Sequence, residues 1–268
     1  MENGVGNKMN LLKKTLLSGI IALSSFNSKA QNQENNKSYE KIIPLINYLN
    51  ARGFGIDSLL KDPRFKIYPG VCSIFKKAPE VKINNLDEYK KIIAYDRKKE
   101  KISGFINNNL EKLLEAEKTY GIQKELIASV IGIESEFGEI NGKYNPFNVY
   151  FSLYSGGCKK DFANEQLEEL LIFCRKNKLD VFSIKSSYAG AVSYAQFIPS
   201  SLNKWFIGND FNNMDNNILS VANYLSYFNK KTGSISRAVW NYNPSEIYVK
   251  AVLALAKDAE ELLKKNKK

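Results

Sequence analysis

The stretch of sequence that decides the fold spans residues 120–138 and reads YGIQKELIASVIGIESEFG. Five of its aliphatic side chains recur at the spacing of an α-helix and form one stripe, namely Leu126, Ile127, Val130, Ile131 and Ile133. Glu134 falls inside this stripe, whereas Glu136 is rotated from it by about 200° and is expected to face solvent. The pattern predicts a buried helix that carries one carboxyl group into apolar surroundings.

The position of Glu134 allows two interpretations. Desolvation by aliphatic neighbours raises the pKa of a carboxyl group, which makes it a proton donor near neutral pH and suits a general acid. Alternatively, Glu134 ends its helix and pairs with a lysine, because structural ion pairs also place carboxylates in such positions. Periodicity alone leaves both interpretations open.

The rest of the chain repeats the helical spacing. Apolar residues recur every three to four positions in residues 42–49 and 106–114, and alternating strand patterns are scarce. A further helical segment runs from about residue 245 to 264 and leads into a lysine-rich tail. These patterns predict a mainly α architecture.

The N-terminal segment has the layout of a secretory signal peptide. Two lysines precede an apolar stretch at residues 16–23, and a small-residue end follows at residues 28–30. We therefore predict a signal peptide over residues 1–30, cleaved near Ala30, and a disordered polar linker over residues 31–38. The apolar stretch is shorter than the roughly 20 residues of a spanning helix, so we expect a periplasmic or secreted protein, at most peripheral to a membrane. A retained amphipathic helix is the alternative.

Composition narrows the chemistry. The 268 residues include no histidine and three cysteines, which excludes Ser-His-Asp and Cys-His catalytic units and Cys₄ zinc sites. The formal net charge of +11 suits a polyanionic partner, but no nucleic-acid-binding motif accompanies it, so nucleic acid is not an expected partner. Catalysis must then rest on carboxylates, hydroxyls, amides, amines or a hard cation held by oxygen ligands.

Two later stretches combine polar groups with small or aromatic residues. Residues 186–202 read SSYAGAVSYAQFIPSSL, where Gln196 is an amide among apolar neighbours and needs a partner or a ligand. A tight helix-packing seam is the alternative for this stretch. Residues 240–245 read WNYNPS, and aromatic faces beside amides are suited to sugar rings that carry N-acetyl groups.

In this order, the three stretches resemble the lytic murein transglycosylase B family, which comprises membrane-bound lytic transglycosylase B and its soluble relatives. GIESEFG at residues 132–138 is similar to the catalytic motif of the family, and residues 187–201 are similar to its second motif. SVANYL at residues 220–225 and the Tyr242-Asn243 pair also match. The resemblance covers roughly residues 42–257.

The resemblance implies a goose-lysozyme-like helical catalytic domain with a smaller helical α subdomain. It places the catalytic region at residues 39–268, with an N-terminal helical part at 39–104 and a lysozyme-like core at 105–268. It implies cleavage of the β-1,4 bond between N-acetylmuramic acid and N-acetylglucosamine in peptidoglycan, with formation of 1,6-anhydromuramoyl ends. No cofactor is expected. The expected partners are peptidoglycan glycan strands and the cell-wall machinery.

The resemblance also assigns site residues. Glu134 takes the position of the single catalytic acid and base. The substrate-binding residues are expected to be Tyr89, Lys159, Lys160, Ser187, Gln196, Phe197, Tyr224, Tyr242 and Asn243. Lys159 and Lys160 occupy the place of a pair of arginines, so they keep the charge but lose the bidentate geometry. Ser135 either helps to hold reacting groups or is a plain helix-terminal serine.

A single carboxyl group is consistent with this chemistry. An ordinary glycosidase uses two carboxylates, one of which activates water or attacks the sugar. Here Glu134 would first protonate the leaving oxygen and then take the proton of the sugar's own 6-hydroxyl. Two alternatives remain open, a hydrolytic muramidase on the same scaffold and a non-catalytic peptidoglycan-binding protein.

Neither a metal site nor a disulfide follows clearly from the sequence. Several family members carry a calcium loop, and the corresponding polar residues here are Asn209, Asp210, Asn212, Asn213, Asp215 and Asn216. The bidentate Glu that ends an EF-hand is missing, so no metal is expected. Cys158 and Cys174 are candidates for a disulfide that leaves Cys72 unpaired, and three free buried thiols are the alternative.

Overall fold

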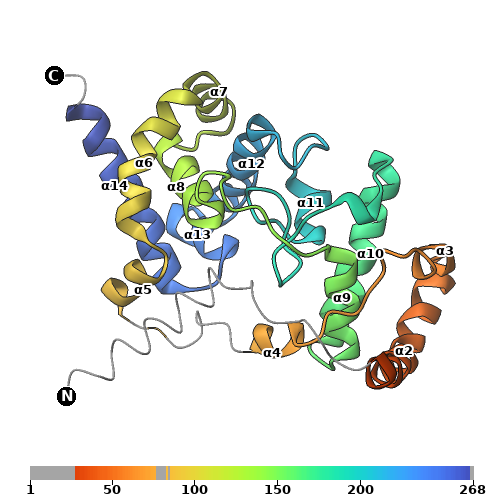
Figure 1. The fold of residues 1–268 in the computed structure, drawn as a ribbon. Coiled ribbons are helices and arrows are strands. Elements are labelled where there is room, and N and C mark those ends of the chain that lie inside the picture. The colour runs from red at the N-terminus through yellow and green to blue at the C-terminus, as the bar shows by residue number, and fades with distance from the viewer. Residues whose placement is uncertain (1–27, 77–82, 84, 266–268) are drawn as a thin grey trace, which may run out of the picture.

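The fold was obtained as a computed structural model, which describes residues 28–76, 83 and 85–265, with side chains from residue 40 onward. The part of the chain so described is helical, and its only β-type pairing consists of isolated bridges (Figure 1). The predicted mainly α fold class is therefore confirmed. Residues 1–27 of the predicted signal peptide lie outside the described residues.

The helices follow one another through short connections. In chain order they are α2 (Ser28–Ala51), α3 (Asp57–Leu60), α4 (Val71–Lys76), α5 (Leu86–Ile92), α6 (Tyr95–Asn108), α7 (Leu110–Tyr120), α8 (Lys124–Ser135), α9 (Pro146–Ser155), α10 (Lys160–Asn177), the 3₁₀ turn η2 (Val181–Ser183), α11 (Pro199–Trp205), α12 (Met214–Thr232), α13 (Ile235–Tyr242) and α14 (Glu246–Lys265). The last helix begins and ends within one residue of its predicted bounds.

Helix α8 is the centre of one group of helices. It packs against α6, α7, α12 and α14, and nearly all of its residues are buried. A helix that is apolar on almost every side is stable only when neighbours enclose it. The buried stripe of the sequence therefore anchors α8 among its neighbours, with Glu134 half-buried near the end of the helix.

Helix α9 is the centre of the second group, which includes α2, α4 and α10. Figure 1 shows this group on the side of the molecule away from α5, α6 and α14. Asn145 fixes the start of α9, because its side chain accepts a hydrogen bond from the Asn148 amide and donates to the carbonyls of Val181 and Ile184. These contacts tie α9 to the segment that leads into the second motif.

Two predicted boundaries differ from the structure. Residues 31–38, predicted as a disordered linker, lie within α2. They contain neither Gly nor Pro, so nothing in the segment interrupts the helix that packs on α9 from Ile42 onward. The predicted division at residues 104 and 105 falls inside α6, and both α5 and α6 pack on α14 of the core. Sequence periodicity describes single helices and does not show which helices pack together.

Both alternatives for the cysteines, a Cys158–Cys174 disulfide and three free thiols, are wrong. Cys72 and Cys158 form a disulfide that joins the start of α4 to the turn between α9 and α10. Cys174 is a buried free thiol, and burial raises its pKa to about 12. The two bonded cysteines are 86 residues apart in the chain, so their proximity depends on how α4 packs against α9. In the described part of the chain, no helix is both long and apolar enough to span a bilayer.

Candidate active site

Glu134 is the penultimate residue of α8 and is half-buried. Tyr248, on α14, donates a hydrogen bond from its hydroxyl to Oε1 of Glu134 over 2.7 Å. Because Tyr248 is only 2% exposed, the surrounding helices hold this donor in place. At Oε1 of Glu134 the structure therefore shows a tyrosine donor, and not the lysine of the alternative interpretation.

Two tyrosines, Tyr248 and Tyr242, lie close enough to this carboxyl group to interact with its charge. Burial raises the pKa of Tyr248 well above its ordinary value, and the charges of Glu134, Tyr242 and Tyr89 add to the effect. Burial also raises the pKa of Tyr242, again with a contribution from the charge of Glu134. The hydroxyls of Tyr248 and Tyr242 therefore stay protonated across the physiological range, and that of Tyr248 is the one that donates to Glu134.

The turn after α8 has an unusual backbone. Glu136 and Phe137 both have positive φ angles, of 55° and 61°. A Cβ atom at Gly132 would lie 2.6 Å from the Phe137 ring, so glycine is needed for this ring to pack on the helix. Ser135 is fully buried, donates to the Ile131 carbonyl and accepts from the Gly138 amide. Of the two predicted roles for Ser135, these contacts favour the helix-terminal serine.

Glu136 does not face solvent, which corrects the prediction from helical periodicity. It is 2% exposed and forms ion pairs with Arg97 and with Lys98, both on α6. Burial by itself would raise the pKa of Glu136, but the hydrogen bond from Arg97 and the charge of Lys98 outweigh burial and leave the pKa below its ordinary value. The helix ends at Ser135, so the rotation of 100° per residue no longer applies to Glu136.

The second motif forms an irregular loop that returns toward α8. Isolated bridges join Tyr144 to Ser186, Ser186 to Val192, and Val192 to Phe197. Ser187 is half-buried, and its hydroxyl accepts a hydrogen bond from the Ala191 amide. In the same loop, Gly190 lets the backbone pack directly against the Tyr150 ring, because a Cβ atom at this position would collide with the ring.

Gln196 is half-buried and has a positive φ of 52°. Its side-chain amide donates to the Ser193 carbonyl over 2.8 Å. The amide group thus has a partner within its own loop, as its apolar neighbours require.

Three predicted aromatic residues meet in one cluster. The ring centroids of Phe197 and Tyr242 are 5.5 Å apart, and those of Tyr224 and Tyr242 are 4.9 Å apart. The Tyr242 hydroxyl donates to the Ala195 carbonyl, and the Tyr224 hydroxyl donates to the Asn241 carbonyl. Phe197 is 3% exposed and Tyr224 is 6% exposed, so both rings are enclosed here, while Tyr242 is half-buried.

The remaining predicted residues lie in three places. Asn243 is half-buried and directly follows α13. Tyr89 lies on α5 and is 4% exposed, packed against the part of α14 that carries Tyr248. Lys159 and Lys160 are exposed at the start of α10, where each ammonium group lies beside an aromatic ring.

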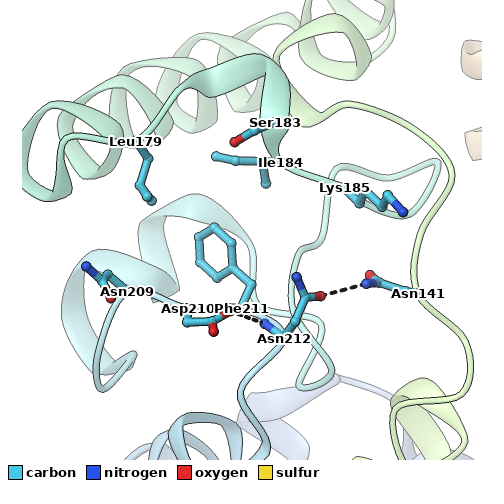
Figure 2. Close-up of a pocket in the computed structure, with 9 residues that line it drawn as sticks. All are labelled: Asn141, Leu179, Ser183, Ile184, Lys185, Asn209, Asp210, Phe211 and Asn212. Atoms are coloured by element: carbon cyan, nitrogen blue, oxygen red, sulfur yellow. Dashed lines mark hydrogen bonds between the residues drawn. The ribbon is translucent and has the colours of Figure 1, made fainter.

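The loop that was compared with a calcium site lines a separate pocket of about 200 Å³. Figure 2 shows Phe211 pointing toward Leu179 and Ile184, and Asn141 donating to Asn212 across the pocket over 2.7 Å. No group of three or more His, Cys, Asp or Glu side chains gathers at one point in the described ranges. Glu134 lines neither this pocket nor a second one, of about 320 Å³, at the N-terminal end of α8.

Tyr248 is the site residue that the sequence analysis missed. It lies among the buried apolar residues of α14, where periodicity assigns it to the core. A tyrosine in a buried stripe needs a partner for its hydroxyl, and that requirement is the only signal in the sequence. It does not identify Glu134 as the partner, because the two residues are 114 positions apart.

Comparison with known proteins gives a consistent result. Residues 50–235 match the family model of the transglycosylase SLT domain. Membrane-bound lytic murein transglycosylase B of Escherichia coli K12 is 28% identical over 128 residues, which span 46% of this chain and 36% of that protein. The match therefore extends over about a third of the length of this curated relative.

The fold is similar to several solved structures. Soluble lytic transglycosylase SltB1 of Pseudomonas aeruginosa matches with a TM-score of 0.73 and 21% identity, over 82% of this chain and 99% of that one. Escherichia coli lytic transglycosylase Slt35, solved with calcium, matches with a TM-score of 0.71 and 18% identity, over 85% and 94%. Pseudomonas aeruginosa SltB3, solved with a NAG-anhNAM-pentapeptide, matches with a TM-score of 0.69 and 17% identity, over 85% and 79%.

At these identities the structural likeness establishes the helical fold, and the family model covers more than two thirds of the sequence. The chain belongs to the transglycosylase SLT domain family, with the fold of the MltB and SltB lytic transglycosylases.

Proposed function

We propose that this protein is a lytic transglycosylase that cleaves the β-1,4 bond between N-acetylmuramic acid and N-acetylglucosamine in peptidoglycan. The observation that carries the proposal is the placement of Glu134, half-buried at the end of α8 with one oxygen bonded to the Tyr248 hydroxyl. The neighbouring carboxyl group, Glu136, is neutralised by Arg97 and Lys98 and is withdrawn from the reaction. Of these two carboxyl groups, Glu134 is thus the one proposed to carry the chemistry.

The reaction needs one group that acts twice. The protonated Glu134 donates its proton to the glycosidic oxygen, so the bond to the anomeric carbon breaks and N-acetylglucosamine leaves with a 4-hydroxyl. The resulting carboxylate then accepts the proton of the muramic 6-hydroxyl, whose oxygen bonds to the anomeric carbon and closes the 1,6-anhydro ring. The carboxyl group ends protonated as it began, and no water enters.

Tyr248 has a positioning role in this scheme. Its hydroxyl donates to Oε1 of Glu134 and so holds the carboxyl group in one orientation for proton exchange with the sugar. A hydrogen bond to the charged form of a carboxyl group also stabilises that form, which is the intermediate state of Glu134 here. The buried Tyr248 thus fixes the orientation of the Glu134 carboxyl group.

Substrate binding is assigned to half-buried polar residues of the second and third stretches of sequence. Ser187, Gln196, Tyr242 and Asn243 would hold the N-acetyl groups, while Tyr89, Phe197 and Tyr224 would support the sugar groove. Lys159 and Lys160 would meet negative groups on the substrate further away. Structures of the similar SltB3 hold NAG-NAM-pentapeptide and NAG-anhNAM-pentapeptide, which supports a substrate of this class. We further propose a periplasmic or secreted location, with the cell-wall machinery as a partner.

The experiment is digestion of purified peptidoglycan sacculi with the purified protein, followed by mass spectrometry of the released muropeptides. The proposal predicts anhydromuramoyl ends, which are lighter than reducing ends by one water. Reducing ends would instead establish the hydrolytic muramidase. Binding to sacculi without release of any fragment would establish the non-catalytic binding protein.

A further inference from the structure

Helix α11 ends beside α12 (Figure 1), and three aromatic side chains from these two helices pack together there. The ring centroids of Trp205 and Tyr227 are 5.8 Å apart, those of Trp205 and Phe228 are 5.4 Å apart, and those of Tyr227 and Phe228 are 5.0 Å apart. Tyr227 is 49% exposed, and it is the one aromatic among the large exposed apolar side chains of the described residues. We call these three residues the aromatic patch.

The aromatic patch packs against the aromatic cluster of the candidate active site through the enclosed ring of Tyr224. Tyr224 precedes Tyr227 and Phe228 by three and four residues, so all three share one face of α12. The Tyr224 ring centroid lies 4.7 Å from Trp205 and 4.9 Å from Tyr242, so Trp205 and Tyr242 are separated by no more than about 10 Å. That span is comparable to two sugar units. Tyr242 lies close enough to Glu134 for the charge of that carboxylate to raise the pKa of Tyr242.

Positive charge borders the aromatic patch. The Lys204 ammonium group lies 5.8 Å from the Trp205 ring centroid and is exposed. Lys230 and Lys231 follow Tyr227 by three and four residues, so they continue its face of α12 and are also exposed. Flat rings surrounded by ammonium groups suit a ligand that combines apolar sugar faces with carboxylates.

We propose that the aromatic patch binds the part of a peptidoglycan glycan strand that extends beyond the scissile bond. N-acetylhexosamine rings stack on Trp205 and Tyr227, and the lactyl and peptide carboxylates of the strand pair with Lys204 and its neighbours. This inference rests on the proposed function, because the occupant is the same substrate. It adds a distal subsite that selects long strands over short fragments.

The first test compares ligand lengths with a variant that does not cleave. Calorimetry on Glu134→Gln measures binding of β-1,4-linked N-acetylglucosamine oligomers of two, four and six units. We expect affinity to rise with length, and Tyr227→Ser in the same background to weaken binding of the longest oligomer by about two- to tenfold while the dimer is affected less. Ile172→Ser removes a comparably exposed apolar side chain from α10 and is the matched control, expected to leave the length dependence unchanged.

The second test uses Trp205 as its own reporter, because the chain has two tryptophans, Trp205 and Trp240. In Glu134→Gln with Trp240→Phe, the hexamer should change the fluorescence of Trp205 and the dimer should not. The distal subsite would be overturned if Tyr227→Ser and its parent bound the hexamer with equal affinity and the fluorescence of Trp205 did not change. Binding of the oligomers in that case would still support a saccharide-binding site at Glu134. The proposed function would be overturned as well if no oligomer bound and if the parent protein released no fragments from sacculi.

Discussion

Replacement of Glu136 by glutamine tests how the turn behind the proposed catalytic acid is held. The side chain of Glu136 is 2% exposed and that of Lys98 is 5% exposed, so the substitution leaves a buried ammonium group without its counter-charge. Removing one partner of a buried pair costs about 3–5 kcal/mol. Lys98 keeps a 2.6 Å hydrogen bond to the Ile93 carbonyl, and Arg97 is 51% exposed and can be hydrated. We therefore expect a loss near the lower limit, about 3 kcal/mol.

The assay is urea unfolding followed by circular dichroism, with a control from the same two segments. Glu139 and Lys101 also join the turn after α8 to α6, but both are exposed, at 58% and 36%. An exposed pair contributes less than about 1 kcal/mol, so Glu139→Gln should be nearly neutral. Adding Lys98→Met to Glu136→Gln removes the unpaired charge and should restore part of the lost stability.

The same variant has a predictable pH dependence. The pKa of Glu136 in the folded protein lies below its ordinary value of 4.5, so its stabilising effect is complete above that pH and is lost as pH falls through the lower folded value. The stability difference between the parent and Glu136→Gln should therefore shrink on acidification. A loss for Glu136→Gln no larger than for Glu139→Gln, or a difference that grows in acid, would refute the reasoning.

Three other changes have defined outcomes. Replacing Cys72 and Cys158 by serine reopens a loop of 86 residues and should lower stability by up to about 4–5 kcal/mol, an effect that dithiothreitol reproduces in the parent; equal unfolding midpoints with and without reductant would contradict it. Tyr248→Phe removes the donor to the proposed catalytic carboxyl group and should lower kcat by about ten- to a hundredfold at an almost unchanged KM; an unchanged kcat would exclude the positioning role. Gly142→Ala places a Cβ atom into the backbone of the neighbouring loop and should lower the free energy of unfolding by about 1–3 kcal/mol. Gly104→Ala, in open space on α6, should leave stability unchanged or raise it. Equal effects of the two variants would show that the loop moves to accommodate the new Cβ atom.

Local patterns predicted the parts of the molecule that depend on local structure. The apolar stripe around Glu134 identified α8 and the enclosed position of the carboxyl group, because burial of a helix is encoded at its own periodicity. The last helix, α14, was equally clear, since its apolar residues keep one spacing over its whole length.

The features that sequence analysis missed depend on long-range packing or on the backbone beyond a helix end. Glu136 turns inward because the chain adopts a positive φ there, which periodicity cannot foresee. The Cys72–Cys158 disulfide and the contact of Tyr248 with Glu134 join segments that are distant in the sequence. The spacing of residues along the chain does not predict such contacts.

The most direct test of the central claim is the rate at which Glu134→Gln releases fragments from peptidoglycan sacculi, measured beside its binding to the same sacculi. Loss of a general acid and base costs about 10²- to 10⁴-fold, so we expect release to fall at least a hundredfold while binding is retained. Release at the parent rate would show that Glu134 is not the group that carries the proton.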